Sequence, residues 1–278
     1  MHYLENKDLD TIFDKAGESL EKGLPFVIYR KPDATQMYGV FQSSTDLKLT
    51  KDFTEIGFVF APFDKADKAI LIQPDAFWTA EYVPEKTQRP ANADLDELGR
   101  ENHLKLVERG IAEIKKGRLQ KVVLSRQIAL DIAKSPIQIF KTLLNTYTNA
   151  FGYLFHHPKV GTWCGATPET LVRVKNKHLQ TMSLAATLPH IENEEPQWGE
   201  KEIQEQQMVS EYIGDKLAHA MEVLEIDEAE SVRAGNLWHL RSEVRGTMLP
   251  NVKVREVIRA LHPTPAVCGI PTNEAQLF

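Results

Sequence analysis

The sequence contains little cysteine and no long apolar run. Its two cysteines, Cys164 and Cys268, lie far apart and neither belongs to a C-x-x-C pair, so neither a disulfide framework nor a zinc site is predicted. No run approaches the roughly 20 apolar residues of a membrane span. Residues 1–5 have neither the basic nor the apolar part of a signal peptide. We therefore expect a cytoplasmic protein with no membrane partner.

Positive charge is also scarce relative to negative charge. The 33 lysines and arginines are outnumbered by 39 aspartates and glutamates, which gives a formal net charge of -6. A nucleic-acid-binding protein needs a basic face to displace counterions from phosphates, so this class is excluded. What is present, 42% hydrophobic and 26% charged residues over 278 positions, is typical of a globular protein with a sizeable core. We expect it to act as a monomer.

A polar stretch at residues 84–94 divides the chain, because proline, glutamine, asparagine and charge replace the apolar pattern there. Before it, short apolar stretches between Pro, Asp and Gly turns predict strands at residues 25–29, 36–42, 57–61 and 68–73. We therefore expect a β-rich part of the fold over residues 1–90 and a second region over residues 95–278.

The second region begins with a predicted helix that ends at Gly117 and leads into a strand at residues 121–126, which Lys121 opens. The apolar stripe of this helix consists of Leu104, Val107, Ile111 and Ile114. Between residues 153 and 186, short β-like runs separated by turns predict an antiparallel meander, with one of the turns at residues 175–177.

A long helix should follow the meander, with Glu202 and Glu205 together on one face of its first turn or just before it. A strand at residues 237–249 and a short helix at residues 252–261 are predicted next. Strands and helices without a regular βαβ alternation predict an α+β fold, with antiparallel sheets flanked by helices.

Several charged residues lie inside or beside apolar strand patterns, and each has an ordinary structural explanation. Lys121 precedes Val-Val-Leu and is typical of a solvated strand edge. Glu169 follows Thr-Pro and is typical of a surface turn, and His239 in Leu-Trp-His-Leu is typical of a hydrogen-bonded packing residue. Glu202 and Glu205 are compatible with an acidic first helical turn that favours the helix dipole. The alternative is that these residues form one site.

Six sequence blocks favour that alternative. In chain order they are Lys121-Val-Val-Leu-Ser-Arg126, Gly165-Ala-Thr-Pro-Glu169, Ser183-Leu-Ala-Ala-Thr187, Lys201-Glu-Ile-Gln-Glu205, His239-Leu240 with Gly246, and Leu261-His-Pro-Thr-Pro-Ala-Val-Cys-Gly-Ile-Pro271. Together they resemble the signature blocks of chorismate-utilising enzymes, which include isochorismate synthases, salicylate synthases, anthranilate synthase component I and aminodeoxychorismate synthase. The resemblance implies an aminodeoxychorismate synthase-like α+β fold and makes residues 95–278 the chorismate-binding catalytic region.

Within this family, two positions resemble the members that use water rather than ammonia. Lys121 stands where those members have their general base, and anthranilate synthases typically have glutamine. Ala266 stands where isochorismate synthases have alanine and where anthranilate and salicylate synthases have threonine. The resemblance therefore implies conversion of chorismate to isochorismate, for menaquinone or for a siderophore.

The resemblance also implies a role for each residue. Lys121 would activate water against ring carbon 2, and Glu169 would give a proton to the hydroxyl leaving carbon 4. Glu205, with Glu202 as a nearer or water-mediated partner, would bind Mg2+. The remaining matched residues would help to bind the substrate: Thr187, His239, Ala266 and Val267.

Three departures from the family pattern have consequences. Ala186 replaces a glycine, which could narrow the pocket or merely be tolerated, and Gln206 replaces a histidine after the metal-binding glutamate. The family also continues beyond the last block with a Glu-x-x-x-Arg-Gly-x-Tyr-like segment, so we expect a C-terminally truncated fold. The other outcomes are a salicylate or anthranilate synthase-type enzyme, or an inactive chorismate-binding fragment.

Overall fold

The computed structural model describes residues 4–50, 52–64, 68–85 and 99–278. The chain forms two compact units. The first unit comprises Met1–Pro90 and Ala133–Glu169, and the second comprises Ala91–Ile132 and Thr170–Phe278. Residues 133–169 pack with the N-terminal residues because a later strand of the chain pairs with an early one. The functional division into residues 1–90 and 95–278 stays a prediction, and most of the predicted linker lies outside the described residues.

In its described residues, the first unit contains two helices and two mainly antiparallel sheets. Its elements are β1 (Leu4–Asn6), α1 (Leu9–Glu21), β2 (Phe26–Arg30), β3 (Gln36–Phe41), β4 (Lys48–Leu49), β5 (Phe58–Phe60), β6 (Ile70–Ile72), β7 (Ala76–Glu81), α3 (Pro136–Thr146), β9 (Phe151–His157) and β10 (Gly161–Thr167). A six-stranded sheet has the order β1-β7-β3-β2-β9-β10, in which only the β1–β7 pair is parallel. A three-stranded sheet has the order β4-β6-β5. The four strands predicted for this part, now β2, β3, β5 and β6, are confirmed.

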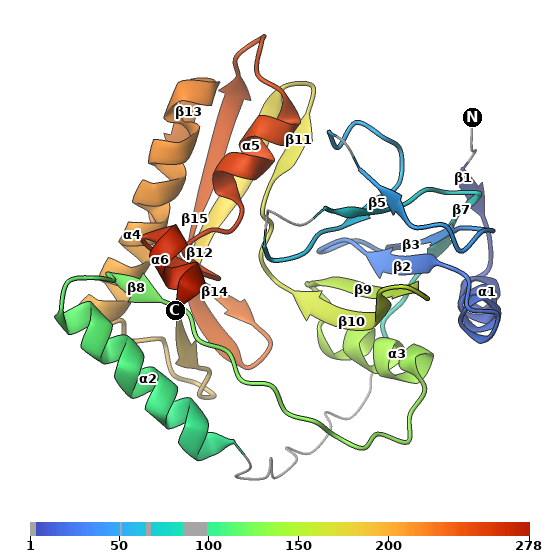
Figure 1. The fold of residues 1–278 in the computed structure, drawn as a ribbon, viewed down its shortest axis with the longest axis horizontal. Coiled ribbons are helices and arrows are strands. Elements are labelled where there is room, and N and C mark those ends of the chain that lie inside the picture. The colour runs from blue at the N-terminus through green and yellow to red at the C-terminus, as the bar shows by residue number, and fades with distance from the viewer. Residues whose placement is uncertain (1–3, 51, 65–67, 86–98) are drawn as a thin grey trace. The chain divides into compact units, whose positions relative to one another are not determined.

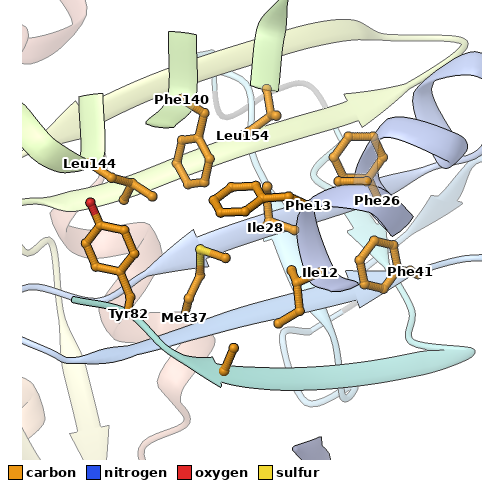
Figure 2. Packing of buried hydrophobic residues seen from close by; sticks show 12 residues of the cluster. Ile12, Phe13, Phe26, Ile28, Met37, Phe41, Tyr82, Phe140, Leu144 and Leu154 are labelled. Carbon is orange, nitrogen blue, oxygen red and sulfur yellow. The ribbon is translucent and has the colours of Figure 1, made fainter. Parts of the chain in front are cut away.

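Apolar side chains cover both faces of the six-stranded sheet. On one face, Phe13 of α1 and Phe140 of α3 pack with Ile28 of β2 and Leu154 of β9, as Figure 2 shows. On the other face, a second cluster includes Val27, Val40 and Phe155 of the sheet and Ile72 of β6. The capping box of α3 supports this packing, since the Ser135 hydroxyl accepts the Gln138 N–H and the Gln138 side chain accepts the Ser135 N–H.

The second unit is built around a five-stranded antiparallel sheet. Its elements are α2 (Arg100–Lys115), β8 (Lys121–Val122), β11 (Arg173–Lys175), β12 (His178–Pro189), α4 (Glu200–Leu217), the 3-10 turn η1 (Ala218–Ala220), β13 (Met221–Ile226), β14 (Glu230–Ala234), β15 (Leu237–Met248), α5 (Val254–Leu261), β16 (Gly269–Ile270) and α6 (Thr272–Leu277). The sheet order is β11-β12-β15-β13, and β14 also pairs with β15. The short strands β8 and β16 form a separate antiparallel pair. Figure 1 shows the long strands β12 and β15 with α4 beside them.

The core of the second unit lies between α4 and this sheet. Val209, Ile213 and Leu217 recur at helical spacing on α4 and are fully buried against the sheet, which contributes Leu179 and Val244. The predicted helix at α4, strand at β15 and helix at α5 are confirmed. Helices on the faces of separate, mainly antiparallel sheets confirm the predicted α+β class.

Two expectations about the second unit were wrong in detail. The strand that begins at Lys121 ends at Val122, because its partner β16 is only two residues long. The meander is divided between two sheets, since β9 and β10 belong to the first unit and β11 and β12 to the second. The helix predicted before Gly117 is confirmed as α2, although Leu104, Ile111 and Ile114 are exposed and it is the face with Gly110 that lies against Val122 and Leu124.

Candidate active site

Lys121 lies at the start of β8, where Ile270 of β16 is its cross-strand partner. The approach of the two strands requires Gly269, because a Cβ added there would lie 2.3 Å from the Lys121 carbonyl oxygen and 2.7 Å from the Cβ of Ala275. Gly269 also has φ of +152°, a conformation that other residues rarely adopt. The side chain of Lys121 is thereby brought into the interior, with only 8% of the residue exposed.

The buried ammonium group of Lys121 contacts oxygen atoms from different parts of the second unit. Its Nζ donates a hydrogen bond of 2.7 Å to the carbonyl oxygen of Pro265. It lies 3.3 Å from Oε1 of Glu205 on α4. A charge removed from water must be paired and hydrogen-bonded, and these contacts meet that requirement. The structure therefore brings together the predicted base Lys121, the predicted metal ligand Glu205 and the segment that carries Ala266 and Val267.

The segment after α5 forms a tight turn. The carbonyl oxygen of Thr264 accepts the N–H groups of Val267 at 3.2 Å and Cys268 at 3.0 Å. Ala266 packs partly against the second unit's core, while Val267 is exposed. The hydroxyl of Thr264 is buried and has no hydrogen-bond partner among the described residues. This hydroxyl lies one residue before the carbonyl that contacts Lys121, and no sequence signal distinguished it.

Glu202 and Glu205 lie one turn apart on α4 and are the candidate ligands for a cation. Glu202 is 3.6 Å from the ammonium of Lys201, and Oε1 of Glu205 contacts Lys121. Among the residues that the structure describes, no group of three or more His, Cys, Asp or Glu side chains could hold a metal. Two carboxylates nevertheless fit Mg2+, which usually takes one or two carboxylates and completes its octahedron with water and substrate oxygens.

Directly beside Glu205, Gln206 is buried against the sheet. Its side-chain amide nitrogen donates toward the hydroxyls of Ser183 on β12 at 2.9 Å, Ser242 on β15 at 2.8 Å and Ser210 on α4 at 3.0 Å. The hydroxyls of Ser183 and Ser210 are themselves 2.6 Å apart. We call Gln206, Ser183, Ser210 and Ser242 the amide cluster. Sequence reasoning noticed Gln206 only as a departure from a family histidine.

Thr187 and His239 are also brought together. Nδ1 of His239 is 2.9 Å from the carbonyl oxygen of Ala186 and 3.2 Å from the hydroxyl of Thr187. Ala186 has φ of +62°, and the register of β12 against β15 shifts between Ala185 and Leu188. An alanine in the left-handed region costs about 1–2 kcal/mol, a cost that a glycine would not have. The irregularity turns Thr187 toward His239.

Glu169, the predicted acid, is the last residue of the first unit and follows β10. Its backbone N–H donates to the hydroxyl of Thr167 at 3.3 Å. Because Lys121 belongs to the second unit, the predicted cavity shared by Glu169 and Lys121 stays a prediction. Cys164, also on β10, is no candidate nucleophile, since burial raises the pKa of its thiol to about 11.

Comparison with known proteins identifies the family. The model of the family described as chorismate binding enzyme matches residues 63–278. The chain is 30% identical over 245 residues to isochorismate synthase DhbC of Bacillus subtilis (strain 168), which covers 77% of this chain and 60% of that protein. It is 29% identical over 223 residues to isochorismate synthase MenF of the same organism, with 75% and 47% covered. The chain thus spans about half to three-fifths of the length of these relatives.

Solved structures show the same fold. DhbC from Bacillus anthracis aligns with a TM-score of 0.74 at 23% identity, over 95% of this chain and 79% of that one. MenF from Escherichia coli aligns with a TM-score of 0.66 at 16% identity, over 91% of this chain and 71% of that one. The predicted aminodeoxychorismate synthase-like fold is therefore confirmed as the fold of these enzymes. Among the described residues, no helix has the length and apolarity needed to span a membrane. This chain belongs to the chorismate binding enzyme family.

Proposed function

We propose that this protein converts chorismate to isochorismate in a Mg2+-dependent reaction. The observation that carries the proposal is the buried amine of Lys121, held 2.7 Å from the Pro265 carbonyl and 3.3 Å from Glu205. A solvated lysine at a strand edge would not need such partners. The family match and the two relatives named isochorismate synthases support the same reaction.

Lys121 is the proposed base. Water is a poor nucleophile, and a neutral amine in a buried position can take its proton as the oxygen bonds to ring carbon 2. The carbonyl of Pro265 orients the amine by accepting one of its N–H groups. Ala266 and Val267 follow this carbonyl and would place the substrate ring beside the amine.

Glu169 is the proposed acid at carbon 4. As the bond from carbon 4 to its hydroxyl breaks, the Glu169 carboxyl gives that oxygen a proton and water leaves, while the ring double bonds shift. One water is therefore taken up and one released, so the reaction is an isomerisation. The Thr187 hydroxyl and the His239 imidazole, which contact each other, would hydrogen-bond near the leaving group.

Glu205 and Glu202 are the proposed Mg2+ ligands. Glu205 has two carboxylate oxygens, so it can contact Lys121 through Oε1 and offer Oε2 to a cation. When bound, Mg2+ would neutralise the charge of the ring carboxylate of the substrate. Glu202, one helical turn earlier, would contact the ion directly or through water.

The direct test is incubation of the protein with chorismate and Mg2+, followed by chromatography for isochorismate, salicylate and anthranilate, with and without ammonium. Isochorismate alone is expected. Salicylate or ammonium-dependent anthranilate would identify a sister reaction, and no product would identify a chorismate-binding fragment. Omission of Mg2+ and the Glu205→Gln variant should each abolish turnover.

The Lys121→Gln variant tests the base. Removal of a general base typically lowers the rate by about 10^2 to 10^4. Lys105→Gln is the matched control, because Lys105 lies on the surface of α2 in a pair with Glu101 and should leave turnover unchanged. Wild-type turnover by Lys121→Gln would show that another group activates the water.

A further inference from the structure

The amide cluster interrupts an otherwise apolar contact between α4 and its sheet. Along α4 the sheet-facing side chains are Gln206, Val209, Ile213 and Leu217, and all four are buried. Ser183 and Ser242, which receive Gln206, are direct cross-strand partners in the β12–β15 ladder. Gln206 is 5% exposed, and Ser183 and Ser242 are 0% and 3% exposed. A polar group is therefore buried where a leucine would fit the pattern.

Every member of this cluster is constrained by the others. The amide nitrogen of Gln206 has two hydrogens and lies within 3.0 Å of three hydroxyl oxygens, so two of the hydroxyls must share one hydrogen. The hydroxyls of Ser183 and Ser210 are 2.6 Å apart, so one of them also donates to the other. The arrangement ties one side chain to two strands and to the following turn of its own helix.

This geometry fixes the rotation of α4 at the residue that follows Glu205. Apolar contacts such as those of Val209 and Ile213 are non-directional, and a helix held by them alone can rotate by a small angle at little cost. Hydrogen bonds weaken steeply when their angles change, so the amide cluster permits one rotation. Adjacent helical residues are about 100° apart around the axis. When Gln206 points into the sheet, Glu205 is directed to the side, where Lys121 lies 3.3 Å away.

We propose that Gln206 is a positioning residue, which acts through the amide cluster to hold the Glu205 carboxylate against Lys121. The catalytic meaning of this role rests on the proposed function, but the positioning itself does not. Gln206 contacts neither substrate nor Lys121 in this scheme. Its effect is to set the direction of its neighbour.

The test is the Gln206→Leu variant, which preserves approximate size and removes the amide. The full chain is treated with trace acetic anhydride, and acetylation at Lys121 is quantified by mass spectrometry relative to the surface residue Lys105. Lys121 is shielded by burial and by Glu205, so loss of the alignment should raise its relative labelling about fivefold, the effect of one lost hydrogen bond. Gln206→His, which keeps a ring N–H donor, should restore most of the protection.

A matched control separates positioning from general loosening of α4. Val209→Ala removes apolar contact one turn further along the same face and leaves the amide cluster intact, so it should destabilise the fold without changing the relative labelling of Lys121. Equal labelling in Gln206→Leu and wild type, or an equal rise in Val209→Ala, would overturn the proposal. If Gln206→Leu does not fold, Ser242→Ala removes one acceptor and must show a smaller rise of the same kind. An unchanged value there would also overturn it.

Turnover provides a second readout that stands apart from the first. If the protein forms isochorismate, Gln206→Leu should lower kcat with little change in KM, and Gln206→His should recover kcat. If the wild-type protein forms no isochorismate, the proposed function fails, and the labelling comparison still decides whether Gln206 positions Glu205.

Discussion

The first unit holds its sheet together with aromatic rings, whereas the second unit places hydroxyl, amide and ammonium groups beside its apolar core. In the first unit, Tyr29 stacks on Tyr38 with ring centroids 5.3 Å apart, and Phe60 stacks on Phe155 at 4.3 Å. In the second unit, the buried side chains include Gln206, which donates to the Ser242 hydroxyl at 2.8 Å, and Lys121, which donates to the Pro265 carbonyl oxygen at 2.7 Å. The first unit therefore depends on aromatic rings that fill its interior, and the second depends in addition on the direction of its buried hydrogen bonds.

Among the described residues, Arg30 of the first unit and Lys121 of the second are buried cations, and their partners differ in kind. In the first unit, Arg30 is 1% exposed, donates to the carbonyl of Tyr147 at 2.8 Å and lies 5.2 Å from the ring of Tyr82. Burial lowers the pKa of its guanidinium, whereas the nearby Tyr82 and Asp33 act to raise that pKa. Lys121 instead has a carboxylate beside it. Arg30, held by a ring and a carbonyl, connects elements of the first unit, whereas Lys121 has an ionisable carboxylate beside it, as the proposed chemistry requires.

The largest expected effect on stability is in the aromatic core. Phe140→Ala should lower the free energy of unfolding by about 3–5 kcal/mol, because Phe140 is fully buried among Phe13, Leu144 and Leu154 and its loss leaves a cavity. Denaturant unfolding measures the change. Trp163→Ala, at a half-exposed position of the same unit, is the control and should cost much less. Similar losses in the two variants would show that the first unit does not depend on close packing.

A smaller loss of stability is expected where Gly269 of β16 approaches the backbone of β8. Gly269→Ala places a methyl group against the Lys121 carbonyl and should cost about 1–3 kcal/mol, because β8 and β16 must separate. The turnover rate should fall by more than the loss of folded protein explains, because the β8–β16 pair carries Lys121. The control is Gly17→Ala in α1 of the first unit, where nothing lies within 4 Å of the added Cβ and helix propensity favours alanine. A loss of stability at both glycines would argue against the specific clash.

The smallest effect on stability concerns pH and involves His156 of the first unit. Burial, and secondly the neighbouring His157, lowers the pKa of His156 below its usual 6.5. As pH falls below 6.5 the unfolded chain binds a proton before the folded chain does, so stability is complete above pH 6.5 and declines as pH falls toward the folded pKa. Unfolding curves at pH 7.5 and 5.5 should show the loss, and His156→Gln should reduce it. The same pH dependence in that variant would assign the effect to another group.

The sequence predicted those parts of the fold whose signals are local. Alternating or continuous apolar stretches located β2, β3, β5 and β6, and a 3.6-residue period located α4. The turn at Asn176 and Lys177 was also recognised, and both residues have positive φ, as a two-residue hairpin turn requires. The pairing of β9 with β2 could not be predicted in this way, because it depends on which apolar strands meet across more than a hundred residues.

The candidate site was predictable residue by residue but not as an arrangement. Family resemblance selected Lys121 and Glu205, and only the structure puts them 3.3 Å apart. The amide cluster was missed because Ser183 and Ser242 resemble ordinary polar strand positions, which usually face water. The apolar spacing on α2 correctly predicted a helix but not which face packs, since its leucine and isoleucines are exposed.

The pairing of β8 with β16 has a consequence for the order in which the molecule folds. Pro265, which contacts Lys121, lies 144 residues further along the chain, and the two strands offer only two residues each to hold the closed loop. Closing so long a loop costs conformational entropy, and the contacts that compensate for this cost form only after closure. Such pairs are therefore expected to form late on the folding pathway. The sheet of β12 and β15, whose strands are much closer in sequence, can form first. By this argument Lys121 reaches its partners after the β12–β15 sheet has formed, and a partly folded chain with that sheet in place would have no assembled base.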